Sequence, residues 1–453
     1  MRIALYHNLG PGGGKRHLYE QARELQARGH VLDLFVPATA NETFLPLAPL
    51  CREVKVYGGS ASGNEAMAAA PTAPRESDGG RVAVLRRAAR TVFGNAGHDA
   101  LAERVYERRL ASRIADLAVQ NAQIARDIDD GAYDVAYVHQ CALTLAPGVL
   151  RLVRNVPTVF VCHDTPRWAY EWAVEESPDY DSLPEKSGRR RRLGSLVSRV
   201  QGRLASDSDR RFVANCRAAT MVLSNSCYSR ECTVRATGTN PRICYPGVDT
   251  EFFAPGDAPA TERRRDVLSV GALLPTKQHE FILRAVAAIP ASRRPGLGIL
   301  GYESPAAGGK SGVGIEGKRL SEIAGGLGVA LTLNRDVTDT TIRDAYQRAA
   351  VVAFPPYLEP FGLVALEAMA CETPVVGVRE GGVRETVRDG ETGLLTDRDI
   401  PAFAAALDRI LSDPELGRRM GSAGREWARS EWSWSRSVDV AESWLHRAVK
   451  ERR

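Results

Sequence analysis

The sequence lacks the features of a disulfide-bonded, zinc-binding or membrane-spanning protein. Its eight cysteines are scattered through 453 residues, without a CxxC pair or a zinc-like spacing. Cys162 and Cys371 lie in apolar stretches, where a cysteine behaves as a small hydrophobic residue. No apolar run reaches the length that spans a bilayer, and the first residues have a strand pattern instead of that of a signal peptide. These absences predict a cytoplasmic protein with reduced thiols.

An excess of charge of one sign is also missing. The chain has 60 Lys and Arg against 55 Asp and Glu, a net charge of +5 at pH 7. So small a net charge over this length gives no indication of a nucleic-acid partner. With 44% hydrophobic and 25% charged residues, the composition is that of a globular protein long enough for two domains.

The first forty residues follow the order of a βαβ unit. A strand at residues 2–7 leads through Gly12, Gly13 and Gly14 into an amphipathic helix at 16–28, and a second strand covers 31–36. A nicotinamide-dinucleotide site would have an acidic residue at the end of that second strand, where Val36-Pro37 stands instead. The pattern therefore predicts a Rossmann-like domain that is not a dehydrogenase. The three glycines allow close approach of the backbone to a phosphate or sugar.

Two further strands are predicted at 135–139 and 158–163. Each ends in a histidine, His139 and His163, and ligands of doubly wound sheets lie at these carboxyl ends. His163 has the stronger claim to a functional role, although a hydrogen-bonded structural histidine is the alternative. Asp129-Asp130 is predicted to be a helix end before Gly131 and not a metal site.

Residues 351–376 combine a strand, a loop broken by Pro355-Pro356 and a helix from Leu363 to Ala370. Glu359 lies in the loop, and Glu367 lies about one turn into the helix. The first N–H groups of a helix have no partner inside it, so those of Phe361, Gly362, Leu363 and Val364 can bind an anion. The carboxylates can accept hydrogen bonds from hydroxyl groups, and the backbone amides can donate to a phosphate. The combination therefore indicates a ligand that is a polyhydroxylated anion.

The segment from Glu359 to Glu367, within E-P-F-G-L-V-A-L-E-A-M-A-C, resembles the signature of the retaining glycosyltransferases of family 4, or glycosyltransferase group 1. The similarity continues through Gly381-Gly382 and the following D-G-E-T-G-L-L. This resemblance implies an α/β fold of the GT-B type. Such a fold has two Rossmann-like domains that face each other across a cleft, and a C-terminal helix that returns to the first domain.

The resemblance also implies roles for individual residues. Glu367 would hold the ribose hydroxyls of the donor, and Glu359 the hydroxyls of its sugar. His163 would face the donor sugar and diphosphate, and the glycines Gly12 to Gly14 would face the diphosphate and the acceptor. Lys277, just ahead of a predicted helix, is well placed to put a point charge on the diphosphate.

One position departs from the family pattern. Ala272 stands where many members have an arginine, so the usual pair of cations is reduced to Lys277. Arg335, which follows another predicted strand, is a candidate substitute.

The predicted domains are residues 1–247, on the acceptor side, and 266–430, on the donor side. A linker at 248–265 joins them, and the helix at 431–453 crosses back. A basic helical insertion occupies about 168–210. It combines Lys186 and Arg189 to Arg192 with apolar residues at helical spacing, which suits peripheral contact of 186–210 with an anionic membrane at its inner face. A solvated helix face packed on its own domain is the alternative.

The sequence therefore predicts a hexosyltransferase that uses a nucleotide-diphosphate sugar and an unidentified acceptor hydroxyl. The sequence has no evident metal motif, so we expect no metal and no cofactor. Lys277 and the helix N-terminus would then meet the charge of the leaving diphosphate. Retention of the anomeric configuration is implied by the resemblance alone. A catalytically silent nucleotide-sugar or glycan-binding protein of the same fold is the alternative, and a nucleotide-sugar epimerase fits the motif less well. The donor base, its sugar, the acceptor and the oligomeric state stay open.

Overall fold

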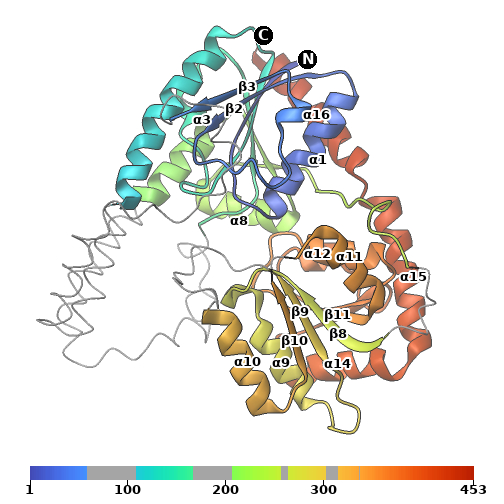
Figure 1. The fold of residues 1–453 in the computed structure, drawn as a ribbon. Coiled ribbons are helices and arrows are strands. Elements are labelled where there is room, and N and C mark those ends of the chain that lie inside the picture. The colour runs from blue at the N-terminus through green and yellow to red at the C-terminus, as the bar shows by residue number, and fades with distance from the viewer. Residues whose placement is uncertain (59–108, 167–206, 257–263, 302–314, 336, 453) are drawn as a thin grey trace, which may run out of the picture. The chain divides into compact units, whose positions relative to one another are not determined.

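The computed structural model describes the chain outside residues 59–108, 167–206, 257–263, 302–314, 336 and 453 (Figure 1). By its internal contacts the chain divides into two compact units. The first contains Met1–Cys162, Val200–Val222 and Glu442–Arg453, and the second contains His163–Arg199 and Leu223–Ala441. Most of the predicted basic insertion at about 168–210, including residues 186–206 of the segment expected to contact a membrane, lies outside the described residues.

The first sheet has seven strands in the order β3-β2-β1-β4-β5-β6-β7. Its central strands are buried apolar runs, the pattern of a parallel sheet covered on both faces. Strand β1 pairs in parallel with β2 and with β4, as the βαβ order predicts. The strands are β1 (Arg2–Asn8), β2 (Val31–Pro37), β3 (Glu53–Tyr57), β4 (Val135–Cys141), β5 (Thr158–Cys162), β6 (Met221–Ser224) and β7 (Arg242–Ile243).

The first helix begins earlier than predicted. Helix α1 (Gly13–Ala27) includes Gly13 and Gly14, and Gly12 is its N-cap, so the glycines form the helix start and not a loop before it. Gly29, with φ +85°, follows the helix and turns the chain into β2. The other helical segments beside this sheet are η1 (Ala48–Leu50), residues 109–130, α3 (Val149–Leu152), residues 207–218 and α8 (Cys227–Thr237).

The second sheet has six strands in the order β10-β9-β8-β11-β12-β13, and all five neighbouring pairs are parallel. In chain order this is 3-2-1-4-5-6, the doubly wound arrangement in which the strand order reverses between β8 and β11. Loops after these two strands therefore lie side by side at the edge where such sheets bind ligands. The strands are β8 (Arg264–Val270), β9 (Leu297–Gly301), β10 (Leu331–Arg335), β11 (Ala349–Phe354), β12 (Val375–Val378) and β13 (Gly393–Thr396).

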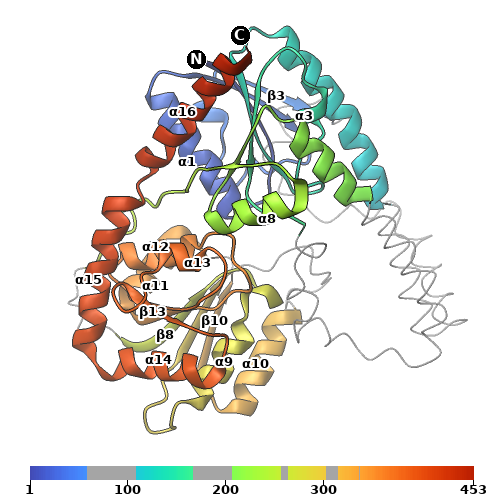
Figure 2. The ribbon, with the colours of Figure 1, turned by 180° about the vertical axis from the view of Figure 1, so that it is seen from behind.

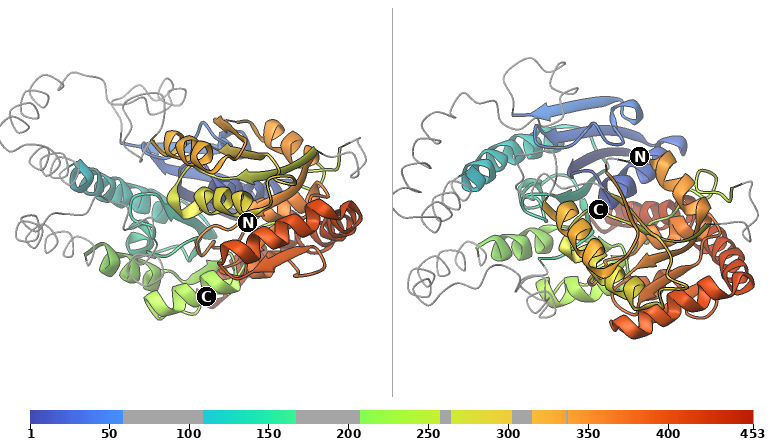
Figure 3. Two further views of the ribbon diagram at one scale, coloured as in Figure 1. Left: turned by 90° about the horizontal axis from the view of Figure 1, so that it is seen from below. Right: turned by 60° about the horizontal axis from the view of Figure 1, so that its bottom comes forward.

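Helices cover both faces of the second sheet, as Figures 1 and 3 show. One face packs α9, α10 and α14 against side chains such as Ile299 and Val351, and the other packs α11, α12 and α15 against their neighbours Leu300 and Val352. The alternation follows from the two-residue period of a strand. The helices are η3 (Pro275–Lys277), α9 (His279–Ala288), α10 (Ile315–Leu327), α11 (Asp339–Arg348), α12 (Leu363–Ala370), α13 (Val383–Thr386), α14 (Ile400–Ser412) and α15 (Pro414–Glu431).

The last helix, α16 (Trp434–Arg452), begins in the second unit and ends in the first. Within the first unit Glu442 accepts hydrogen bonds from Arg28 and His30, each at 2.8 Å, next to the end of α1 (Figure 2). The predicted return of the C-terminal helix is thus confirmed. Among the described helices, none has the combination of length and apolar character that a bilayer span needs.

Gly301, at the end of β9, packs closely against the backbone that follows β8, and substitution of this glycine tests that packing. A Cβ there would lie 1.9 Å from the carbonyl oxygen of Gly271, so the backbone would have to move. We expect Gly301→Ala to lower the free energy of unfolding by about 1–3 kcal/mol, measured by urea denaturation. The control is Gly325→Ala in α10, where a Cβ meets nothing within 4 Å. It should be neutral or stabilising by up to about 1 kcal/mol. Equal effects of the two substitutions would contradict the packing argument.

Candidate functional site

Two predicted site residues meet at the switch point of the second sheet. Lys277 follows β8, Glu359 follows β11, and the Lys277 ammonium donates to a Glu359 carboxylate oxygen at 2.7 Å. The two side chains are 29% and 17% exposed, so a ligand can reach both. The structure therefore brings a cation and an anion together where doubly wound sheets bind ligands.

A buried histidine that the sequence analysis missed shapes the loop before Lys277. Burial lowers the pKa of His279 to about 4, so its ring is neutral at pH 7. We assign the ring proton to Nε2, which donates to the carbonyl of Ala272 at 3.2 Å, while Nδ1 accepts from the Ser269 hydroxyl at 3.1 Å. The sequence offers only one indication of this role, namely that His279 is the first residue of a helix.

Helix α12 begins and ends at the predicted residues, Leu363 and Ala370. Its N-cap, Gly362, has φ +110°, a conformation that favours glycine, and no side chain caps the helix. Among the described residues, none accepts a hydrogen bond from the N–H groups of Phe361, Gly362, Leu363 or Val364. The helix start therefore keeps four donors for an anion, directly after the Glu359 loop.

Phe361 and Glu367 fix α12 from inside the unit. The Phe361 ring is 3% exposed and packs against Trp432, with 5.4 Å between ring centroids. Glu367, 8% exposed, accepts a hydrogen bond from the Tyr346 hydroxyl at 3.1 Å. A carboxylate this deeply buried is uncommon in proteins and has to be held by hydrogen bonds such as this one.

The paired glycines Gly381 and Gly382 are explained by the Glu359 loop. A Cβ on Gly381 would lie 2.4 Å from the carbonyl oxygen of Glu359, and one on Gly382 would lie 2.4 Å from that of Pro360. The N–H of Gly382 donates to the Glu359 carbonyl at 2.7 Å. These glycines let the backbone of the loop pack closely.

In the first unit, the start of α1 has a similar set of free donors. The N–H groups of Gly13, Gly14 and Lys15 have no acceptor among the described residues, and the first bonded amide is that of Arg16, to Gly12 at 3.0 Å. Gly13 is exposed. This helix start can therefore approach a ligand with backbone alone.

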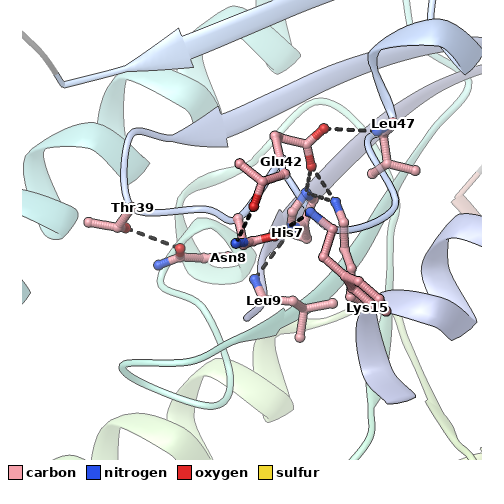
Figure 4. Close-up of polar contacts among 10 residues, drawn as sticks. His7, Asn8, Leu9, Lys15, Thr39, Glu42 and Leu47 are labelled. Atoms are coloured by element: carbon pink, nitrogen blue, oxygen red, sulfur yellow. Dashed lines mark hydrogen bonds and ion pairs between the residues drawn. The ribbon is translucent and has the colours of Figure 1, made fainter. Parts of the chain in front are cut away.

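Behind these glycines lies a buried ion pair that the sequence analysis did not predict (Figure 4). The Lys15 side chain is fully buried and donates to Glu42, which also accepts from His7 at 2.8 Å and from the Leu47 amide at 2.8 Å. The Leu9 amide donates to His7 Nδ1 at 3.2 Å, so we place the ring proton on Nε2. The cluster ties the segment after β2 to the end of β1 and to the first turn of α1.

Charges in this cluster follow from its burial. Burial lowers the pKa of His7 to about 4 and also lowers that of Lys15. Burial raises the pKa of Glu42, but the hydrogen bond from His7 and the charge of Lys15 outweigh it and bring that pKa to about 2. At pH 7 the cluster therefore consists of an ammonium, a carboxylate and a neutral imidazole.

His163 directly follows β5 and is 8% exposed. Burial lowers its pKa to about 4, so its ring can exchange hydrogen bonds with a ligand but carries no charge at pH 7. Its backbone carbonyl accepts from the side-chain amide of Asn225 at 3.2 Å. Asn225 follows β6, the next strand of the sheet, and had no sequence signal of its own.

Arg335, the candidate substitute for the missing arginine, lines a cavity of about 660 Å³ in the second unit. Its guanidinium lies over Gly317 of α10, where a Cβ would meet Nη2 at 2.1 Å. Ala272 is 4% exposed and part of the core. The cavity is lined by Ser321, Leu333, Asn334, Arg335, Val337, Thr338 and Thr341.

Asp129 is a helix-end residue, as predicted. Its carboxylate accepts from the backbone amides of Arg154 and Asn155 at 2.6–3.0 Å. Within the described part of the chain, no group of three or more His, Cys, Asp or Glu is arranged to hold a metal ion.

Comparison with known proteins identifies the stretch that carries most of these residues. Residues 253–427 match the family described as glycosyl transferases group 1. This part of the chain is therefore similar to a glycosyltransferase group 1 domain. Lys277, Glu359 and Glu367 all lie within it, as does the start of α12.

Curated relatives of the chain are named D-inositol 3-phosphate glycosyltransferase. The one from Geodermatophilus obscurus is 39% identical over 216 residues, which are 45% of this chain and 47% of the relative. The one from Acidothermus cellulolyticus is 35% identical over 250 residues, 52% of this chain and 55% of the relative. The chain thus spans about half the length of the curated relatives that it matches.

Solved structures match over the whole chain. Sucrose-phosphate synthase from Thermosynechococcus elongatus has a TM-score of 0.67 at 22% identity and covers 100% of both chains. HepE from Anabaena, in complex with UDP and glucose, has a TM-score of 0.65 at 19% identity and covers 98% of this chain and 99% of that one. The likeness shows the fold, which consists of two α/β domains with parallel sheets.

The buried cluster in Figure 4 predicts how stability depends on pH. The pKa of His7 is about 4 when folded, against 6.5 in its ordinary state, so between these values only the unfolded chain takes up the proton. The contribution of neutral, buried His7 to the free energy of unfolding is complete above pH 6.5 and is lost as the pH falls toward 4. We expect His7→Gln to make the loss of stability between pH 6.5 and 5 shallower, by up to about 1.4 kcal/mol per pH unit.

Urea unfolding at pH 7, 6 and 5 measures this slope. The matched control is His446→Gln, whose side chain is 53% exposed, and it should leave the slope unchanged. Equal slopes for the wild type and His7→Gln would show that His7 takes up its proton in the folded state as readily as in the unfolded one.

Proposed function

We propose that the protein is a glycosyltransferase that moves a hexosyl unit from a nucleotide-diphosphate sugar to an acceptor hydroxyl. The observation that carries this proposal is the meeting of Lys277 and Glu359 directly before the free N–H groups of α12. These groups lie in the stretch that matches the glycosyl transferases group 1 family.

The charges of this site suit a departing diphosphate. The Lys277 ammonium and the amide dipoles at the start of α12 are fixed donors, which stabilise negative charge without reorganisation. Without a ligand, Glu359 holds Lys277. Phosphate oxygens of the donor would compete for that ammonium, and the carboxylate would then be free to accept hydrogen bonds from the sugar hydroxyls. Glu367, deeper in α12, would accept from the ribose.

The remaining predicted residues complete the proposal. His163 is neutral and would contact the donor through hydrogen bonds, so we infer no ionic role for it. The glycines Gly12, Gly13 and Gly14 would present their N–H groups to the diphosphate or to the acceptor. We further propose that the reaction retains the anomeric configuration, as the family resemblance implies. We also propose that it uses no metal, because Lys277 and the start of α12 can meet the charge of the leaving diphosphate. On this view the leaving phosphate takes the acceptor proton.

The comparisons suggest which substrates to try. HepE from Anabaena was solved with UDP, glucose and UDP-glucose, and the relatives are named for D-inositol 3-phosphate. We therefore propose UDP-glucose as the first donor and an inositol phosphate as the first acceptor to assay. A thermal-shift screen of nucleotides and nucleotide sugars would rank other donors, because a ligand that binds the folded state stabilises it.

A catalytically silent nucleotide-sugar-binding protein is the second candidate. It is favoured by Ala272, which is buried in the loop where the family often has an arginine. Release of free sugar from a bound nucleotide sugar, in the absence of acceptor, would favour the transferase. Tight binding without hydrolysis or transfer to any acceptor would favour the silent protein.

Substitution of the two glutamates tests the site. We expect Glu359→Ala and Glu367→Ala each to lower kcat/KM for the donor about tenfold or more, because each removes an acceptor for donor hydroxyls. The control is Glu391→Ala, whose side chain is 68% exposed, and it should keep full activity. Unchanged kcat/KM in both variants, with circular dichroism showing intact folds, would remove these residues from the site.

A further inference from the structure

The loop from Pro355 to Glu359 contains two buried prolines and a residue in a left-handed conformation. Pro355 and Pro356 have no N–H, so they cannot donate to a neighbouring strand or turn. Both residues are buried, and a buried carbonyl group needs a hydrogen-bond donor, which has to come from another part of the chain. Leu358 has φ +45°, in the left-handed region, which costs about 1 kcal/mol or more for a residue other than glycine. A loop with this conformation holds one shape only if its surroundings impose it.

Arg398, two residues after β13, supplies those partners. Its guanidinium donates to the Pro355 carbonyl at 2.9 Å and to the Pro356 carbonyl at 3.0 Å. It forms a two-point ion pair with Glu380, at 2.7 and 3.0 Å, and its charge lies 4.3 Å from the centre of the Tyr357 ring. Four of the five guanidinium donors thus act on this loop or on Glu380.

The loop fixed in this way is also joined to the residues that hold Lys277. The amide of Tyr357 donates to the carbonyl of Thr276 at 2.8 Å, and Thr276 directly precedes Lys277. At the other end of the loop, the Gly382 amide donates to the Glu359 carbonyl at 2.7 Å. Displacement of the prolines would therefore move Glu359 relative to Lys277.

We propose that Arg398 is a positioning residue, which holds the loop from Pro355 to Glu359 so that the Glu359 carboxylate lies against Lys277. Arg398 has only 16% of its side chain exposed and contacts the loop through backbone carbonyls, so it acts through Glu359. We expect loss of Arg398 to weaken recognition of the donor sugar, and this expectation rests on the proposed function. Lysine cannot replace it, because a single ammonium cannot bridge two carbonyls and a carboxylate in one plane.

Arg398→Lys keeps the charge and most of the side chain, and it is compared with Arg425→Lys as matched control. Arg425 also bridges two carbonyls, those of Phe253 and Ala370, at 3.4 and 2.6 Å, in the same unit. Hydrogen exchange should show about tenfold or greater loss of protection at the Tyr357 and Gly382 amides in Arg398→Lys and none in Arg425→Lys. Unchanged protection at both amides would overturn the proposal, whatever the protein's activity.

Calorimetric titration with UDP and with UDP-glucose separates positioning from general damage. We expect Arg398→Lys to weaken UDP-glucose binding about fivefold while UDP binding changes less than twofold, because only the former has a sugar for Glu359 to hold. In a Glu359→Ala background the same substitution should weaken UDP-glucose binding no further. An equal loss for both ligands, or the same loss without Glu359, would overturn the proposal.

The two proposals can fail separately. If Glu359→Ala binds UDP-glucose as well as the wild type does, the donor role of Glu359 falls. The amide protection in Arg398→Lys then still decides whether Arg398 positions the loop.

Discussion

The contact between Lys277 and Glu359 is the constraint on which the candidate site of the second unit depends. A doubly wound sheet places the loops after β8 and β11 next to each other, but it does not determine which side chains meet there. At 2.7 Å, and partly shielded from water, the ion pair needs both loops held accurately. The His279 ring holds the first loop by a hydrogen bond to the Ala272 carbonyl. The Arg398 guanidinium holds the second loop by hydrogen bonds to the carbonyls of Pro355 and Pro356.

Both loops are thus supported by buried or half-buried polar side chains that act on the backbone. This arrangement leaves the faces of Lys277, Glu359 and α12 available to a ligand, since none of the supporting groups uses them. It also explains the glycines around the site. Gly381 and Gly382 pack against the Glu359 loop, and side chains at these positions would push the loop away from Lys277. A preorganised site needs this kind of support.

Sequence alone predicted the parts of the fold that depend on periodicity. Apolar spacing and breaks at proline and glycine predicted the strands near 2–7, 31–36, 135–139 and 158–163, the helix from Leu363 to Ala370 and the place of Lys277 before a helix. They did not predict β3, β9 or β13. The start of α1 was wrong by three residues because glycine is a poor helix former, and here Gly13 and Gly14 are nevertheless helical. Tertiary contacts of Lys15 in that first turn outweigh the low propensity.

The supporting residues could not be predicted for a different reason. Lys15 and Glu42 are 27 positions apart, and Arg398 and Pro355 are 43 apart, with no local pattern that connects them. A lysine and an arginine in a sequence are most often on the surface, and only the fold shows that Lys15 is fully buried. Each unit thus has a helix start bordered by glycine, Gly12 before α1 and Gly362 before α12, with a buried charged residue in the first turns, Lys15 in α1 and Glu367 in α12. The charges of Lys15 and Arg398 act on backbone and on neighbouring charged groups, so their influence on a ligand passes through the helix starts and the side chains that they hold in place.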